Sequence, residues 1–197
     1  MARPAEFVRR DVLEKAMEVF WRTGFTGTSV TDLVKATNLK PGSLYGAFHS
    51  KRGLFMEVID TYAQNSLARV SSCLLNNDSP IEAIQAFFNR FSDDIAMDEI
   101  GRGCLMVNTM LELATEDDEI RERITNYLDQ IEQMFADTLS RAQQQGELTA
   151  EASPEALAKF LMAGMWGMRV MSSKRPHAES YQSIVSNMLN ALPIVKH

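Results

Sequence analysis

Apolar residues recur at helical spacing along most of this chain. Within residues 8–23 they fall at i, i+3, i+4 and i+7, and Gly24 follows where a C-cap glycine would end an amphipathic helix. We find no stretch in which apolar and polar residues alternate as they do in a half-buried strand. The hydrophobic pattern therefore predicts an all-α protein.

Helix start signals divide the rest of the chain. Ser29 and Asp32 have the spacing of a capping box, and Ser79-Pro80 with Glu82 adds a proline in the first turn to the same signal. Glycines and prolines mark the expected ends. Together these signals predict about nine helices, over residues 8–23, 29–37, 41–48, 51–75, 80–95, 104–114, 118–145, 154–174 and 177–192.

The composition is that of a folded chain in a reducing cytoplasm. Of the 197 residues 45% are hydrophobic, with ten Gly and six Pro, which excludes collagen-like and largely disordered chains. Cys73 and Cys104 stand apart from any Cys/His cluster, so we expect neither a disulfide framework nor a metal site. No apolar segment follows the basic first ten residues, and the longest apolar run, 160–168, falls short of the roughly 20 residues of a membrane span. We therefore expect neither secretion nor membrane insertion.

The net charge of −6 hides an asymmetry between the two parts of the chain. Residues 1–52 hold nine Lys/Arg against five Asp/Glu, whereas residues 53–197 hold 11 against 21. The split indicates a small basic module suited to a polyanion and an acidic body that faces away from it.

The first 50 residues contain three short predicted helices, and a tight turn joins the second to the third. This is the arrangement of a helix-turn-helix module. In the third helix, Leu44 and Phe48 share one face and are expected to anchor it on the other two. Another face is slim and polar, suited to a DNA groove, and carries Gly42, Tyr45, Gly46 and His49.

Two segments of this module, Gly-Phe-Thr-Gly-Thr-Ser-Val-Thr-Asp-Leu at 24–33 and Pro-Gly-Ser-Leu-Tyr-Gly-Ala-Phe-His-Ser-Lys at 41–51, resemble the TetR family of transcriptional regulators. The resemblance covers about residues 8–56. It implies a DNA-binding domain over 1–50 and a helical effector-binding and dimerisation domain over 51–197. It further implies a homodimer that acts as a repressor and is released by a small apolar or electrophilic effector.

The resemblance also implies which residues meet DNA. Phosphate contacts are expected from Thr28, Ser29, Tyr45 and Lys51, and base-edge contacts from Lys40, Gly42 and Ser43, with Pro41 and His49 completing the candidate interface. Gly46 and Ala47 stand where many relatives carry an aromatic residue and a histidine. Taken singly, each candidate also fits an ordinary surface residue, helix cap or solvated charge.

The body is rich in methionine and aromatic residues, which suit a cavity for an apolar ligand and equally suit a plain core. A sensing thiol at Cys104, beside Arg102 and near a helix start, is one hypothesis, and a buried cysteine between bent glycine turns is the other. The candidate pocket residues are Phe88, Phe91, Cys104, Met106, Met110, Phe135, Met162 and Trp166.

The last two long helices are apolar on more than one side, so they need a partner surface or lie at the centre of the monomer core. In the family they form the dimer interface, which would place two recognition helices about 34 Å apart and predicts an inverted-repeat operator. The candidate interface residues are Leu161, Gly164, Met165, Met168, Ile184, Val185, Met188 and Leu189.

An enzyme is not indicated. The chain has no GxGxxG, P-loop, HExxH or GxSxG motif, its three histidines are scattered, and no cofactor is expected. The competing hypothesis is a helical ligand-binding or thiol redox protein without a DNA role. It leaves the basic first 52 residues unexplained.

Overall fold

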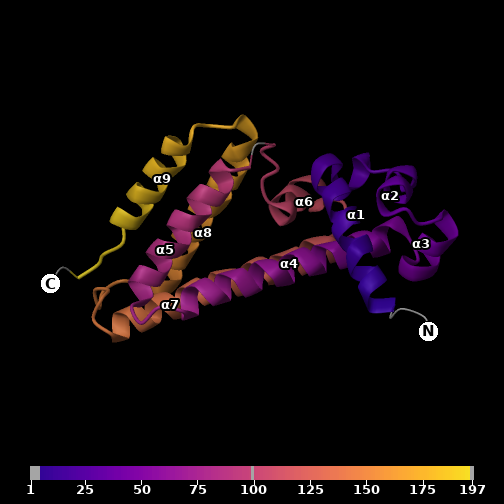
Figure 1. Ribbon diagram of the computed structural model, residues 1–197. Helices are drawn as coiled ribbons and strands as arrows, with labels where there is room; N and C mark the ends of the chain where they lie inside the picture. The colour runs from indigo at the N-terminus through magenta and orange to yellow at the C-terminus, as the bar shows by residue number, and fades with distance from the viewer. Residues whose placement is uncertain (1–4, 99, 196–197) are drawn as a thin grey trace. The chain divides into compact units, whose positions relative to one another are not determined.

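Helix start signals and apolar periodicity set where the helices of this protein lie. The computed structural model describes residues 5–98 and 100–195 (Figure 1). In these residues the chain forms nine α-helices and one short 3-10 turn, close to the predicted spans. They are α1 (Ala5–Gly27), α2 (Val30–Thr37), α3 (Pro41–Phe48), α4 (Lys51–Leu75), α5 (Pro80–Ala96), α6 (Leu105–Leu113), α7 (Asp118–Gln144), α8 (Pro154–Met171), η1 (Ser172–Lys174) and α9 (Ala178–Asn190).

The helices form two compact units. The first contains the described residues up to Asn65 together with Asn108–Ile124, and the second contains Ser66–Val107 and the described residues from Thr125 onward. The expected boundary after residue 50 therefore falls inside the first unit. The reason is that the first half of α4 contributes core side chains such as Phe55 to it.

The core of the first unit is aromatic. Phe20 of α1 and Phe55 of α4 are almost fully buried, with ring centroids 4.8 Å apart, and Phe25 packs on Phe55 at 4.9 Å. Leu33 of α2 and Leu44 of α3 are buried in the same unit. Large apolar side chains thus hold the three indigo helices of Figure 1 and the start of α4 together.

Gly24 interrupts α1 as predicted, but the chain then adds one more helical turn. Its φ of 72° and ψ of 175° lie outside the helical region, in a conformation that favours glycine. The kinked turn that follows, residues 25–27, changes the direction of the chain before α2 begins at Val30.

The second unit buries the predicted apolar stripe of α5. Phe88 packs on Phe135 of α7 with ring centroids 5.7 Å apart, and α9 packs against both α5 and α8. The chain near its C-terminal end closes on the α7–α8 turn through a single bridge between Leu148 and Ile194. None of the described helices is both long and apolar enough to cross a membrane.

Candidate nucleic-acid interface

Helix α3 is built to present one face and bury the other. Lys40 occupies the N-cap without a side-chain cap bond, and Pro41 fills the first helical position, where its missing N–H costs nothing. Leu44 and Phe48 are 1% and 2% exposed, so the predicted anchoring of this helix is confirmed.

The outward face of α3 is open. Tyr45 is 43% exposed, and Lys40, Pro41, Gly42, Ser43 and Gly46 are exposed as well. No atom lies within 4 Å of the place that a Cβ would take at Gly42 or Gly46, so the backbone there is accessible to a close partner. His49, also exposed, follows the helix with a φ of 65°. The structure therefore places these sequence-predicted residues on one module and leaves them accessible.

The start of α2 forms the capping box that the sequence predicted. The Ser29 hydroxyl accepts a hydrogen bond from the Asp32 backbone N–H at 3.1 Å and donates to the Asp32 carboxylate at 2.6 Å. Hydrogen bonds from the Ser29 side chain and backbone lower the pKa of Asp32. Ser29 remains exposed, so the same residue caps the helix and lies open at its N-terminus.

Thr28 and Lys51 have internal roles in this structure. Thr28 is 2% exposed, and its hydroxyl donates to the Gly24 carbonyl at 2.6 Å. The Lys51 ammonium donates to the carbonyls of Phe25 and Thr28 at 2.9 and 3.0 Å and lies 4.2 Å from the centre of the Phe25 ring. Both side chains therefore hold the turn between α1 and α2, whereas the resemblance implies that they contact phosphate.

Acidic residues of α6, of the loop after it and of the first turn of α7 complete the first unit, and no local signal in the sequence points to their distant partners. The Glu112 carboxylate accepts hydrogen bonds from the backbone N–H groups of Phe25 and Thr26. The Arg52 guanidinium binds Asp117 through two hydrogen bonds, at 2.9 and 3.0 Å, and also reaches Glu119 at 2.8 Å. The residues joined are 65 to 87 positions apart, beyond the reach of spacing rules.

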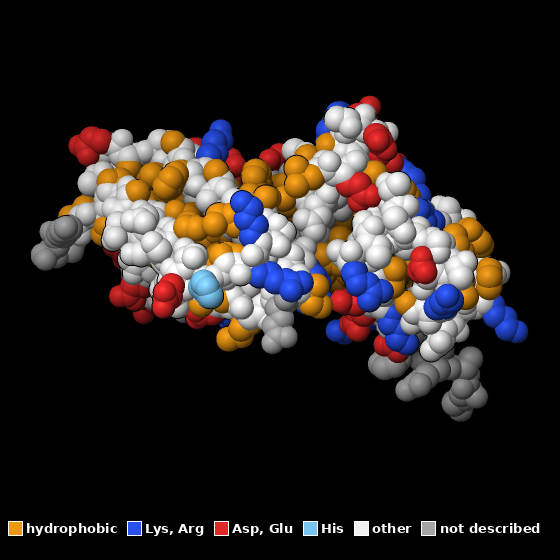
Figure 2. All heavy atoms as spheres, turned by 90° about the horizontal axis from the view of Figure 1, so that it is seen from above, with side chains coloured by type: hydrophobic (Ala, Val, Ile, Leu, Met, Phe, Trp, Pro, Cys, Tyr) orange, Lys and Arg blue, Asp and Glu red, His pale blue; other side chains and the backbone are white. Residues whose placement is uncertain are grey.

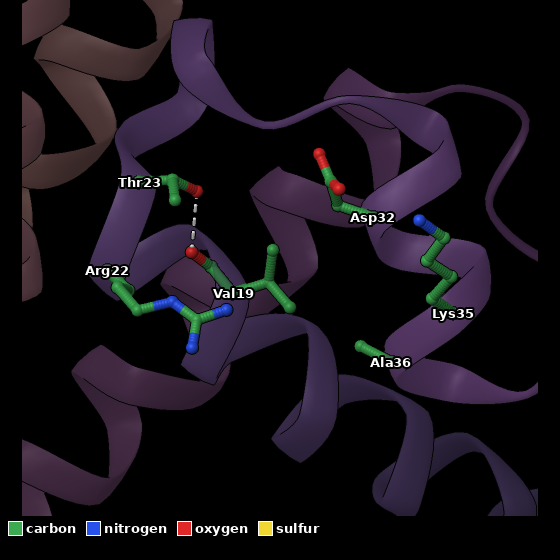
Figure 3. A pocket seen from close by; sticks show the side chains of 6 residues that line it. All are labelled: Val19, Arg22, Thr23, Asp32, Lys35 and Ala36. Atoms are coloured by element: carbon green, nitrogen blue, oxygen red, sulfur yellow. Dashed lines mark hydrogen bonds between the residues drawn. The ribbon is translucent and has the colours of Figure 1, made fainter.

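A hollow of about 390 Å³ lies between α1 and α2. Figure 3 shows its lining, which comes from both helices and includes the cations of Arg22 and Lys35. Thr23 donates to the carbonyl of Val19 on the α1 side. Two exposed cations, Arg22 and Lys35, stand against the one carboxylate of Asp32 in this lining. The hollow therefore adds a small excess of positive charge to a flank of the module that the sequence alone did not single out.

The predicted pocket residues fall in both units. Met110 belongs to the first unit and the other seven to the second. Phe88, Phe91 and Phe135 are buried, and Phe88 packs on both other rings, as plain core packing predicts. Met106 and Met162 are also buried, whereas Cys104, Met110 and Trp166 are half-buried. The buried indole nitrogen of Trp166 and the buried hydroxyl of Ser92, both in the second unit, have no hydrogen-bond partner.

Cys104 directly precedes α6, which begins at Leu105. Both glycines that flank this segment, Gly101 and Gly103, have a positive φ, near 70°. Arg102, expected beside the thiol, forms an ion pair with Asp98 at 3.5 Å, and its backbone N–H donates to the same carboxylate at 2.8 Å. The sequence thus predicted the bent backbone, while the Arg102 charge is directed to an acid.

The candidate dimer residues divide by burial. Leu161, Met165, Met168, Val185 and Met188 are buried within a single chain, whereas Gly164, Ile184 and Leu189 are half-buried. Met188 packs where a side chain at Gly164 would stand, which brings α9 close to α8.

The exposed face of α8 is a different set of small and apolar residues. We call Phe160, Ala163, Gly167 and Val170 the α8 stripe; Phe160 and Val170 are 43% and 51% exposed. Figure 2 shows hydrophobic side chains gathered on the second unit.

A helix-turn-helix module with an anchored, outward-facing third helix, in a chain that also has a second helical unit, defines a DNA-binding transcriptional regulator. Residues 12–58 match the model of bacterial regulatory proteins of the tetR family, and residues 80–186 match the tetracyclin repressor-like C-terminal domain. The chain belongs to the TetR family of transcriptional regulators, a family without enzymatic activity.

Relatives cover nearly the whole chain. It is 29% identical over 192 residues to the transcriptional repressor ComR of Escherichia coli, a match that spans 97% of this chain and 91% of ComR. It is 30% identical to the regulator YezE of Bacillus subtilis, over 98% of this chain and all of YezE. The solved structure of the TetR-family regulator CifR, a cysteine variant bound to 26-base-pair double-stranded operator DNA, is 30% identical, with a TM-score of 0.87 over 98% of this chain and all of that one.

Proposed function

We propose that this protein is a homodimeric repressor that binds an inverted-repeat operator in the cytoplasm and is released from it by a small effector. The observation that carries the proposal is the α3 face, which is open from Lys40 to Tyr45 while Leu44 behind it is buried. CifR, which is 30% identical and bound to operator DNA, supports DNA as the partner. ComR and DhaR, a relative from Mycobacterium that is 27% identical, are both named repressors and support the direction of control.

On this proposal, α3 reads base edges and the start of α2 meets phosphate. Lys40, Gly42 and Ser43 lie at the N-terminal end of α3, the part of a recognition helix that reaches base edges. Tyr45 and Ser29 offer exposed hydroxyls for phosphate oxygens. Thr28 and Lys51 stabilise this surface indirectly, because their hydrogen bonds hold the turn between α1 and α2.

Dimerisation is supported by the α8 stripe. Phe160 and Val170 leave about half of their surface to solvent, and Ala163 and Gly167 between them are small enough for another helix to approach. We therefore place the contact on the α8 stripe and on the half-buried residues Ile184 and Leu189 of α9.

The experiment that tests DNA binding is selection of genomic fragments by the purified protein, followed by titration of the enriched duplex at several salt concentrations. A palindromic duplex bound far more tightly than a scrambled one, by a dimer, supports the proposal. Enrichment of no fragment by the reduced, effector-free protein contradicts it.

An electrophilic effector is the second part of the proposal, with Cys104 as the reacting thiol. Its position directly before α6, in a segment bent at Gly101 and Gly103, favours Cys104 over Cys73, which lies in the last turn of the long helix α4. Treatment with N-ethylmaleimide should release the operator from the wild type and from Cys73→Ser but not from Cys104→Ser. Equal release from all three proteins, or from none, contradicts a sensing role of this thiol.

A further inference from the structure

The carboxylate of Glu112 in α6 binds the Gly24–Ser29 turn, the kinked segment that leads into α2. One carboxylate oxygen accepts the Phe25 backbone N–H at 3.0 Å, and the other accepts the Thr26 N–H at 2.7 Å. All three residues belong to the first unit. The two parallel hydrogen bonds occupy both oxygens of one ionised group, which is the stronger, charge-assisted form of such a contact.

The glycine at position 24 leaves room for this carboxylate. A Cβ at Gly24 would lie 2.7 Å from Oε2 of Glu112, too close for two atoms that are not bonded. Gly24 also has a φ of 72°, a conformation that a side chain would strain. The glycine therefore provides both the bend and the space for the carboxylate.

An anion and a cation bind different backbone groups of the turn: Glu112 binds N–H groups, and Lys51 binds carbonyls. Burial raises the pKa of Glu112, but hydrogen bonds from Thr26 and Phe25 and the charge of Lys51 outweigh it, so that the pKa is lowered overall. The Lys51 ammonium meanwhile holds the carbonyls of Phe25 and Thr28. At neutral pH an anion thus fixes the N–H groups of the turn and a cation fixes its carbonyls.

The turn ends at Ser29, the exposed N-cap of α2, and Thr26 and Gly27 within it are exposed. The N-terminus of a helix is a site where phosphate binds well, because its free N–H groups point outward. A carboxylate beside such a site repels a polyanion, so its charge alone would weaken DNA binding. Glu112 must therefore favour binding through geometry if it favours it at all.

We propose that Glu112 is a positioning residue for operator binding. It holds the Gly24–Ser29 turn so that Ser29 and the first turn of α2 face a phosphate of the duplex. This inference rests on the proposed function, since it presupposes that the protein binds an operator.

The test compares Glu112→Gln with Glu116→Gln on the operator selected by the wild type. Both variants remove one negative charge. Glu112 lies near the end of α6, and Glu116 is exposed in the loop that joins α6 to α7. Long-range electrostatics predicts equal or tighter binding for both. Positioning predicts that Glu112→Gln binds about tenfold more weakly, because the amide cannot accept both N–H groups. The slope of log K against log salt should also fall by roughly 0.9 for each protomer that loses its phosphate contact.

Amide exchange separates this role from general loss of folding. In Glu112→Gln, exchange should accelerate at residues 25–27 while the core helices keep their protection. Gly24→Ala places a methyl group where the Glu112 carboxylate lies and so displaces the carboxylate from the turn. It should reproduce both the weaker operator binding and the faster amide exchange. If the wild type binds its operator and Glu112→Gln binds it as tightly as Glu116→Gln does, this inference is wrong and the proposed function stands. Failure of the wild type to bind any selected duplex overturns the proposed function and this inference with it.

Discussion

Replacing Lys51 by methionine tests whether this cation supports the DNA-binding surface or belongs to it. Methionine keeps most of the side-chain length and removes the ammonium. The variant loses the hydrogen bonds to the carbonyls of Phe25 and Thr28, at 2.9 and 3.0 Å, and the cation that lies 4.2 Å from the centre of the Phe25 ring.

The expected cost follows from these contacts. A hydrogen bond from a charged donor contributes about 1.5–3 kcal/mol when buried, and water replaces part of that at the half-buried Lys51. The contact with the ring adds roughly 0.5–1 kcal/mol. We expect a loss of about 2 kcal/mol in the free energy of unfolding of the first unit. For a chain of this size the loss lowers Tm by roughly 4–8 °C.

The assay pairs this variant with Lys40→Met, because Lys40 is exposed and makes no cap bond. Tm is measured for each free protein, and operator affinity is measured between low and high salt. Lys51→Met should lower Tm and weaken binding, and any fall in its salt slope should come together with this loss of stability. Lys40→Met should leave Tm within about 1 °C. Its affinity for the operator should fall at unchanged Tm, because Lys40 lies at the N-terminal end of α3, the part of the helix that reaches base edges. A reduced slope with an unchanged Tm for Lys51→Met would refute the supporting role.

Three further experiments test the two units separately. A hydrogen bond from Arg52 lowers the pKa of Asp117 below 3.8, so the pair stabilises the fold above that pH and the stabilisation is lost as the pH falls through the folded pKa. Asp117→Asn should therefore lower stability in denaturant titrations at pH 7, and the deficit should shrink steadily as the pH is lowered below 3.8. A deficit that does not depend on pH contradicts this. Gly53→Ala should lower Tm by several degrees, because a Cβ at this position would collide with the last carbonyl of α3. Gly46→Ala is the control, because a Cβ there has open space, and equal Tm values for the two variants contradict the close approach at Gly53. Phe160→Glu on the α8 stripe should yield monomers in sedimentation, and an intact dimer would place the interface elsewhere.

Local signals predicted the helix boundaries because the physics that sets them is local. The start of α5 shows both the success and its limit. Ser79 accepts the Glu82 backbone N–H at 3.1 Å, as the spacing predicted. Glu147 also reaches this site, where it accepts the Ser79 hydroxyl and the Ile81 N–H at 3.0 Å each. No spacing rule links residues 66 positions apart, so only the packing of the second unit identifies this acid.

The dimer candidates show a different limit. Periodicity recognised that α8 is apolar on more than one side, which is correct, but it could not tell which side faces the same chain. Leu161 and Phe160 are neighbours in sequence, yet one is fully buried and the other is 43% exposed. That distinction depends on how α9 and the rest of the second unit pack on α8, and the sequence of α8 contains no signal for it.

The charge asymmetry of the sequence agrees with membership of a DNA-binding family but overstated the number of cations that are free to meet DNA. Arg9 binds Glu57, Arg10 binds Glu14, and Arg52 binds two acids, while Lys51 binds backbone carbonyls. A paired cation attracts phosphate less, because its field is largely cancelled by the nearby acid. On this reasoning the module has modest affinity for duplex DNA of arbitrary sequence. Its specificity then depends on the open face of α3, where glycine backbone and hydroxyl groups can approach the bases closely.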